Sequence, residues 1–393
     1  MIVRQFLQWV RTAPAGERAE AAGALARAFL FSDLPITDRV AVEAAMVRLL
    51  DDVSPLVRAA LAETLATSPD APAAVIHALA QDRSDIAAIV LERSPLFIDA
   101  ELVDFVATGK AEMQCAIARR PWLPAAVAAA IVEVGCAEAC LELIENPDAE
   151  LAALSFDRLV ERFGELAAIR EALIARDDLP VATRQTLVLK LSAMLTRFVV
   201  GREWLEADHA RRVAREACEK ATVALAAHAA EAHAGSLVRH LRLSGQLTAG
   251  LILRALLSGN IALFEQALAE LSELPLARVR ALIHDTSGLG FRSVFGKAEL
   301  PPSTYTAFRH ALEAWREGPD LDGVGRLRRR MVERVLTGCE KAEIGDLEPL
   351  MALLRRFAAE AAREEARDCC DLLEDDGFDF FADDEDEEDR VAA

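Results

Sequence analysis

The side chains most able to bind a metal or take part in catalysis are cysteines and histidines spaced by one or two helical turns. Cys136 and Cys140 are four residues apart and His233 and His240 are seven apart, so on a helix each pair shares one face. Such pairs could bind a metal ion, but neither has the further ligands that a four-coordinate site needs. We therefore expect buried structural cysteines, histidines on a helix surface, no metal and no cofactor.

The motifs of common enzyme classes are missing from the sequence. Gly288 and Gly290 lack the GxGxxG spacing and a preceding strand, and Lys297 does not follow them in a GKS or GKT context. No serine lies in a GxSxG nucleophile elbow. The paired acids Asp51 and Asp52 are typical of a helix N-terminus, where the helix dipole favours negative charge. We expect a helix break at the glycines, no catalytic residues and no enzyme activity.

The densest basic group lies between residues 326 and 334, and two interpretations of it stay open. In the first, the group binds a phosphorylated ligand, a nucleic acid or an acidic segment of a partner. In the second, it is a solvated helix face balanced by neighbouring glutamates. The group consists of Arg326, Arg328, Arg329, Arg330 and Arg334.

The C-terminal segment is strongly acidic but contains aromatic residues. Residues 374–389 include eleven acidic residues and no basic one, together with Phe378, Phe380 and Phe381. Acidic low-complexity segments are disordered and solubilising, whereas aromatics among the acids are typical of segments that fold on binding. Both roles stay open. We predict that this tail transiently covers the arginine group of the same chain, competes there with an acidic partner, and is released by salt.

Charge and composition argue against nucleic-acid-binding, membrane-spanning and secreted proteins. The 393 residues carry a net charge of −20 and are 53% hydrophobic. An acidic chain is a poor partner for nucleic acid, whose binding depends on neutralising phosphates. The most apolar run, 125–132, ends at Glu133 and is too short to cross a membrane. Seven cysteines without a framework spacing, and an N-terminus without a secretory pattern, predict a cytoplasmic protein.

A fixed repeat organises the first half of the chain. Prolines recur every 26 residues, and an aliphatic residue precedes each proline by four positions. Such a period is typical of stacked helical pairs, because one pair cannot bury its own apolar face. We expect each proline to form a corner between two short helices and each aliphatic residue to be buried. The prolines are Pro69, Pro95, Pro121 and Pro147, and the aliphatic residues are Leu65, Leu91, Ile117 and Leu143.

The predicted architecture is an all-α, HEAT-like helical-repeat solenoid. The regular register occupies residues 1–195, a looser helical-repeat region occupies 196–373, and the acidic tail, predicted to be disordered, occupies 374–393. A strongly helical stretch is expected from Val181 to His233. The sequence does not indicate an oligomeric state.

Several segments resemble a known bacterial family. The runs DIAAIVLERSPLFIDAELVDFVATG, QCAIARRPWLPAAVAAAIVEVG and ENPDAELAALSFDRLVERF, followed by RDDLPVATRQTLV, are similar to the family called domain of unknown function 2336. The resemblance covers roughly residues 40–320 and implies an all-helical, HEAT-like repeat protein. It implies no catalytic residues.

We therefore expect a non-enzymatic scaffold or adaptor whose surface binds a protein partner, with a regulatory role open. Two alternatives remain: a nucleic-acid-associated HEAT-like protein and a sensor of a small phosphorylated ligand. A continuous basic groove would favour the first alternative, and a local arginine pocket would favour the second.

Overall fold

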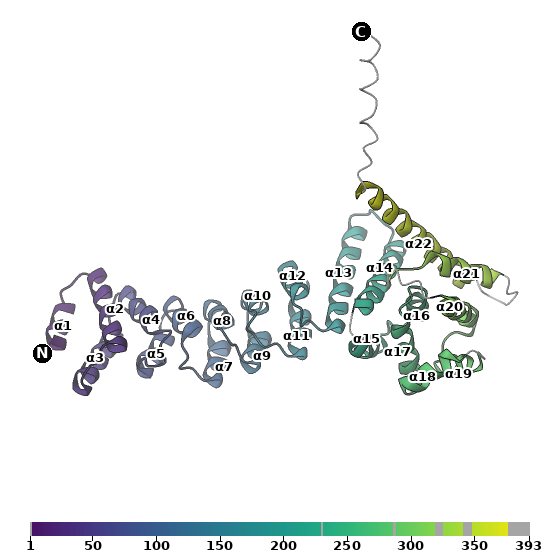
Figure 1. The fold of residues 1–393 in the computed structure, drawn as a ribbon. Helices are drawn as coiled ribbons and strands as arrows, with labels where there is room; N and C mark the ends of the chain where they lie inside the picture. Colours follow the sequence, from purple (N-terminus) through teal and green to yellow (C-terminus); the bar gives the residue numbers. More distant parts are fainter. Residues whose placement is uncertain (1, 229–230, 286–287, 319–324, 341–347, 376–393) are drawn as a thin grey trace, which may run out of the picture. The chain divides into compact units, whose positions relative to one another are not determined.

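The computed structural model describes residues 2–228, 231–285, 288–318, 325–340 and 348–375. Within these ranges the chain forms twenty-two α-helices and one short 3-10 helix, with no strand (Figure 1). The predicted all-α fold is confirmed. None of the described helices combines the length and the apolar character that crossing a membrane requires.

The chain divides into two compact units, residues 1–190 and 191–393. The sequence analysis placed the end of its first region at residue 195. The helices of unit 1 are α1 (Ile2–Val10), α2 (Ala15–Phe31), α3 (Ile36–Leu49), α4 (Pro55–Leu65), α5 (Ala73–Ala80), α6 (Ser84–Arg93), α7 (Asp99–Thr108), α8 (Ala111–Ala118), α9 (Ala125–Val134), α10 (Ala137–Glu145), α11 (Ala153–Phe163), α12 (Ala167–Ala175) and the first part of α13 (Val181–Gly201).

The helices of unit 1 stack in two rows that follow the order of the chain. In one row, α4, α6, α8, α10 and α12 each contact the next helix of the set, and in the other α7 contacts α9 and α9 contacts α11. Figure 1 shows these helices lying side by side from α4 to α12. One apolar cluster runs through both rows, from Ala22 to Leu187. The core of unit 1 is therefore continuous from repeat to repeat.

The 26-residue register matches the observed helices. All four aliphatic residues of the register are fully buried. Each of the four prolines stands at the first position of a turn between two helices. A proline fits there because its ring removes an N–H donor and disfavours a helical residue before it. The predicted core positions and proline corners are confirmed.

Polar side chains connect successive repeats at the helix ends. The last carbonyls of a helix have no partner within it, so a buried helix end needs external donors. In the row from α6 to α12, these donors come from the end of the next helix in the row. Arg120 donates to the carbonyls of Leu91 and Ser94, Asn146 to those of Ala118 and Arg120, and Arg176 to those of Ile144 and Asn146.

Unit 2 contains the rest of the described helices. They are the end of α13, α14 (Ala207–His228), α15 (Glu231–Leu243), α16 (Ala249–Leu257), α17 (Ile261–Ser272), α18 (Leu276–His284), α19 (Leu289–Lys297), the 3-10 helix η1 (Pro302–Thr304), α20 (Tyr305–Glu317), α21 (Arg329–Glu340) and α22 (Glu348–Asp375). Part of its core is aromatic: the ring centroid of Phe264 lies 6.1 Å from Phe308 and 6.3 Å from Phe291.

Two breaks between helices bear on the sequence analysis. The predicted break is confirmed at Gly288, which has a φ of 72° and directly precedes α19, whereas Gly290 lies inside that helix. The strongly helical stretch expected from Val181 to His233 is present as successive helices, and the structure places a turn within it. The helix α13 ends at Gly201, and α14 begins at Ala207. Between them Glu203 adopts a left-handed φ of 58°, which turns the chain.

Candidate functional site

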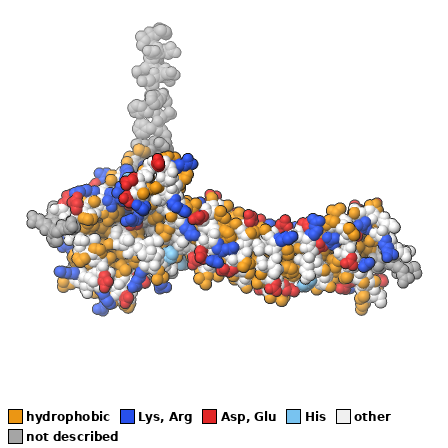
Figure 2. Space-filling view, turned by 180° about the vertical axis from the view of Figure 1, so that it is seen from behind, with side chains coloured by type: hydrophobic (Ala, Val, Ile, Leu, Met, Phe, Trp, Pro, Cys, Tyr) orange, Lys and Arg blue, Asp and Glu red, His pale blue; other side chains and the backbone are white. Residues whose placement is uncertain are grey.

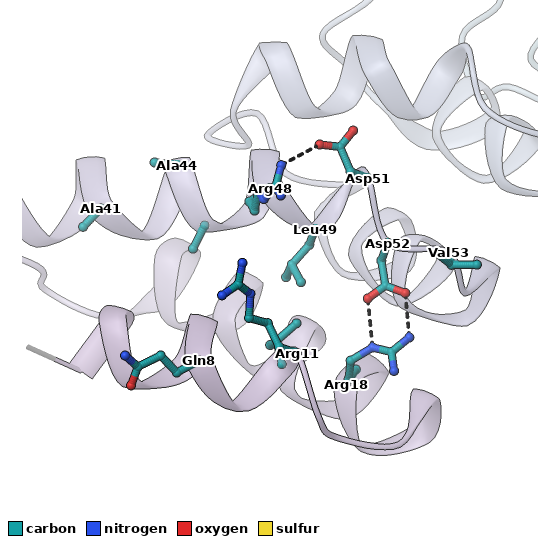
Figure 3. Close-up of a pocket in the computed structure, with 12 residues that line it drawn as sticks. Gln8, Arg11, Arg18, Ala41, Ala44, Arg48, Leu49, Asp51, Asp52 and Val53 are labelled. Atoms are coloured by element: carbon teal, nitrogen blue, oxygen red, sulfur yellow. Dashed lines mark hydrogen bonds and ion pairs between the residues drawn. The ribbon is translucent and has the colours of Figure 1, made fainter.

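A hollow lies at the N-terminal end of unit 1. Its volume is about 780 Å³, and it opens to solvent between α1, α3 and the turn before α4. Of its twelve lining residues, six are apolar, five are charged and one is a glutamine (Figure 3). The lining residues are Gln8, Val10, Arg11, Arg18, Ala41, Ala44, Ala45, Arg48, Leu49, Asp51, Asp52 and Val53.

An ion pair between Arg18 and Asp52 fixes the floor of the hollow. The two side chains meet in a bidentate arrangement, with Nε–Oδ2 and Nη2–Oδ1 distances of 2.9 and 2.8 Å. The hydrogen bond from Arg18 is the main cause that lowers the pKa of Asp52 below its usual value. Arg18 also donates to the carbonyl of Ala13 at 2.8 Å. These contacts connect the start of α2 to the turn before α4.

The remaining charged groups of the hollow differ in how they are paired. Arg48 forms a solvent-exposed pair with Asp51 at 3.3 Å. Arg11 extends toward α3 in Figure 3 without an interaction to the other residues drawn. No hydrogen bond or ion pair of its side chain occurs among the described residues. Because two aspartates offset two of the three arginines, one positive charge remains without a partner.

The apolar wall of the hollow determines which side chains a bound segment can carry besides an acidic one. Ala41, Ala44 and Ala45 lie on α3 with Leu49, and Val10 faces them from α1. Small side chains leave room for a polypeptide to come close to the helix. The hollow therefore suits a segment that carries apolar side chains and one carboxylate. The sequence analysis missed this site because its residues are far apart in the chain: Arg18 and Asp52 are separated by 34 positions.

The predicted arginine group lies at the start of α21, where acidic residues already pair with much of it. Arg326 pairs with Asp368 of α22 at 2.8 Å. Arg329 pairs with Glu333 at 2.7 Å and with Glu365 at 3.1 Å, and Arg334 pairs with Glu317 of α20. Arg328 is half-buried against Gly259.

Arg330 is the exposed member of the group that has no ion-pair partner among the described residues. A role of the group in binding stays a prediction. Phe378, Phe380 and Phe381 of the acidic tail lie outside the described residues, and so does the predicted contact between the tail and the arginines.

Of the two cysteines considered for a metal site, Cys140 is buried as expected and Cys136 is half-buried. Burial is the main cause that raises the pKa of Cys115 and of Cys140 to about 11 each. The thiol of Cys140 donates to the carbonyl of Ile131 at 3.6 Å, and the sulfur of Cys136 accepts from the backbone N–H of Ala139 at 3.4 Å. Among the described residues, no three His, Cys, Asp or Glu side chains are grouped so that they could bind a metal.

We expect a large difference in reactivity among the thiols. Cys369 and Cys370 are exposed on α22, so a thiol reagent should modify them within minutes at pH 7.5. Cys115 and Cys140 should react only after unfolding, because the thiolate is the reactive form and their raised pKa values keep them protonated. Mass spectrometry of the modified peptides would measure this order. Rapid labelling of Cys115 or Cys140 in the folded protein would contradict it.

Comparison with protein families gives one match. The model of a family described as an uncharacterised protein conserved in bacteria, domain of unknown function 2336, matches residues 86–345. The chain belongs to this family. The matched segment starts later than the resemblance at roughly residue 40 suggested, and it ends beyond residue 320. No curated protein and no solved structure matches the chain.

The segment that matches the domain of unknown function 2336 family includes much of both units but not the hollow. The residues that line the hollow lie between Gln8 and Val53, before the matched segment begins. The arginine group lies within the matched segment. The hollow is thus built by residues that precede the part of the chain matched by the family model.

Proposed function

We propose that this protein is a non-enzymatic, cytoplasmic adaptor in which unit 1 is a HEAT-like solenoid that binds a segment of a protein partner. The hollow beside α3 is the observation that carries this proposal. It combines an apolar wall with the unpaired guanidinium of Arg11. The segment we propose for it carries apolar side chains and an acidic residue that pairs with Arg11.

The stacking of unit 1 supports an extended binding role. Each added helical pair enlarges the surface of a solenoid while contacting only its neighbours, so binding is the usual function of this architecture. The two rows of helices and the continuous core of unit 1 fit such an arrangement.

The nucleic-acid alternative finds less support. Arg120, Arg162 and Arg176 donate to backbone carbonyls inside unit 1, so these arginines are not available to a phosphate backbone. On the face shown in Figure 2, acidic and basic side chains are interspersed along the described residues without a continuous basic band. Binding to nucleic acid depends on several uncompensated basic residues along one surface.

A small phosphorylated ligand is the second candidate, because three arginines line the hollow. Asp52 and Asp51 pair with two of these arginines, and a dianionic phosphate would have to compete with both carboxylates. A single carboxylate can pair with Arg11 without displacing either aspartate. The charge of the hollow therefore favours a peptide over a phosphate compound.

Replacing Arg11 by glutamate tests the proposal. Peptides selected from a random library on the wild-type full chain should be rich in apolar residues around one acid. The Arg11→Glu variant should bind them at least about tenfold more weakly, because a charge-assisted hydrogen bond is lost and a repulsion is introduced. Fluorescence anisotropy with labelled peptides would measure the affinities.

Arg330→Glu provides the matched control, since Arg330 is also an exposed arginine that has no ion-pair partner in the described part of the chain. This variant should bind the selected peptides as the wild type does. If Arg330→Glu abolishes binding and Arg11→Glu does not, the arginine group is the binding site and the hollow is not. A tighter interaction with inorganic phosphate or a nucleotide than with any peptide would favour the sensor instead.

A further inference from the structure

Three large apolar side chains are exposed at the corners of consecutive repeats in unit 1. The exposed fractions are 64% for Ile98, 82% for Trp122 and 80% for Leu154. Each residue lies at or just before the N-terminal end of a helix: Ile98 before α7, Trp122 before α9 and Leu154 in the first turn of α11. We call these three residues the edge row.

The three corners lie along one edge of the stack. The helices α7, α9 and α11 are successive neighbours, so their N-terminal ends follow one another. The backbone N–H of Glu150, in the corner before α11, donates to the carbonyl of Leu123, in the corner before α9, at 3.2 Å. Packed helices lie about 8–10 Å apart, so the N-terminal ends of α7, α9 and α11 recur at roughly that interval.

Trp122 is held outward by an unfavourable backbone conformation. Its φ is 55°, a left-handed value that is uncommon for a bulky residue. Such a conformation persists only where the surrounding structure enforces it, and it is frequent at binding sites. Here Pro121 and Pro124 flank the residue. Tryptophan is also the residue type most enriched among the side chains that dominate binding energy at protein interfaces.

The charges around the edge row are acidic. Asp99, Asp148 and Glu150 are exposed in the same corners. None of these carboxylates forms an ion pair among the described residues. The guanidinium groups of Arg120 and Arg176 in these corners donate to backbone carbonyls, Arg120 to those of Leu91 and Ser94 and Arg176 to those of Asn146 and Ala149. An acidic segment, including the tail of this chain, would be repelled from the edge.

We propose that the edge row is a second binding surface, which takes a basic amphipathic helix of a protein partner. In a helix with a rise of 1.5 Å per residue, side chains seven positions apart recur at about 10 Å, which matches the spacing of the corners. Apolar residues at this spacing contact Ile98, Trp122 and Leu154. Lysines or arginines between them pair with Asp99, Asp148 and Glu150.

A designed peptide tests this surface on the full chain. The probe is a labelled helical peptide with leucines seven positions apart and lysines between them, and its partner probe has the same composition with the leucines scrambled. The wild-type protein should bind the first peptide at least tenfold more tightly than the second. Trp122→Ser should weaken the first interaction about thirtyfold, as expected for a dominant interface tryptophan. The double variant Asp148→Lys, Glu150→Lys should weaken it as well.

Controls separate this surface from the hollow and from loss of folding. Arg11→Glu should leave the binding of the basic peptide unchanged, so the two proposals can fail independently. Trp122→Asn, which tolerates the left-handed conformation, should keep the melting temperature of the wild type and still lose binding. The proposal is overturned if Trp122→Ser and Trp122→Asn bind the peptide normally, or if the scrambled peptide binds equally well, since binding would then reflect net charge alone.

Discussion

Replacing Leu91 by alanine is expected to lower the free energy of unfolding by about 2–5 kcal/mol. Leu91 is fully buried in the core of unit 1, and the same holds for its register equivalents Leu65, Ile117 and Leu143. Removing the three outer carbons of the leucine side chain from such a site loses transfer free energy and leaves a cavity in packed surroundings. Urea unfolding of the full chain, followed by circular dichroism, would measure the change.

The same substitution at an exposed leucine provides the control. Leu154 is 80% exposed, so Leu154→Ala should change the free energy of unfolding by no more than about 0.5 kcal/mol. A substitution at the register proline Pro95 should also cost less than Leu91→Ala, because this residue forms a corner and does not fill the core. If Leu91→Ala and Leu143→Ala both behave like Leu154→Ala, these residues are not equivalent core positions.

Replacing Glu360 by alanine is expected to destabilise unit 2 by about 3–5 kcal/mol. Glu360 of α22 holds Arg254 of α16 in a bidentate pair, with N–O distances of 2.8 and 2.9 Å. The side chain of Arg254 is only 2% exposed, and its guanidinium lies 4.6 Å from the ring of Phe357. Without Glu360, a buried charge would retain only the more distant Glu219, at 4.0 Å.

Two comparisons identify the cause of this loss. Glu365→Ala, five positions further along α22, removes an exposed partner of Arg329 and should cost less than about 1 kcal/mol. The double variant Arg254→Met, Glu360→Leu removes both charges and should recover part of the stability lost in Glu360→Ala. Equal effects of Glu360→Ala and Glu365→Ala in denaturant unfolding would show that burial of Arg254 does not control the stability of unit 2.

The repeat register could be predicted because it depends on local rules. A proline restricts its own backbone and that of the preceding residue, and an aliphatic residue four positions earlier lies one turn back on the helix. These rules apply in every repeat. Leu91 and Ile117 are therefore both buried, and Pro95 and Pro121 both begin a turn. The all-α fold and the buried positions follow from them.

The contacts that join the repeats could not be predicted in the same way. The position just before the register proline is Ser68, Ser94, Arg120 or Asn146, so serine occupies it in two repeats and a larger polar side chain in the other two. Arg120 and Asn146 lie beside the carbonyls at the end of the preceding helix of the row, a place that only the stacked structure creates. The one sequence signal that could have indicated this role as a hydrogen-bond donor is that Arg120 and Asn146 each stand directly before a register proline.

The turn after α13 depends on tertiary packing as well as on local sequence. The sequence analysis predicted a strongly helical stretch from Val181 to His233 and did not locate the turn within it. In the structure the backbone N–H of Trp204 donates to the carbonyl of Val199 at 3.0 Å, and the Trp204 ring packs edge-on against Phe198, with the ring centroids 5.6 Å apart. The helix α13 ends at Gly201, and the left-handed Glu203 turns the chain after it.

The proposed adaptor function is tested most directly by site-specific photo-crosslinking of the full chain in the cells that produce it. A benzophenone side chain at Ala44, in the hollow, should capture a protein partner through a segment that carries an acid among apolar residues. The same group at Ala74, an exposed alanine of α5 outside the hollow, should not capture it. Arg11→Glu should abolish the product at Ala44. A product that forms equally at both positions, or that persists in Arg11→Glu, would contradict binding in the hollow.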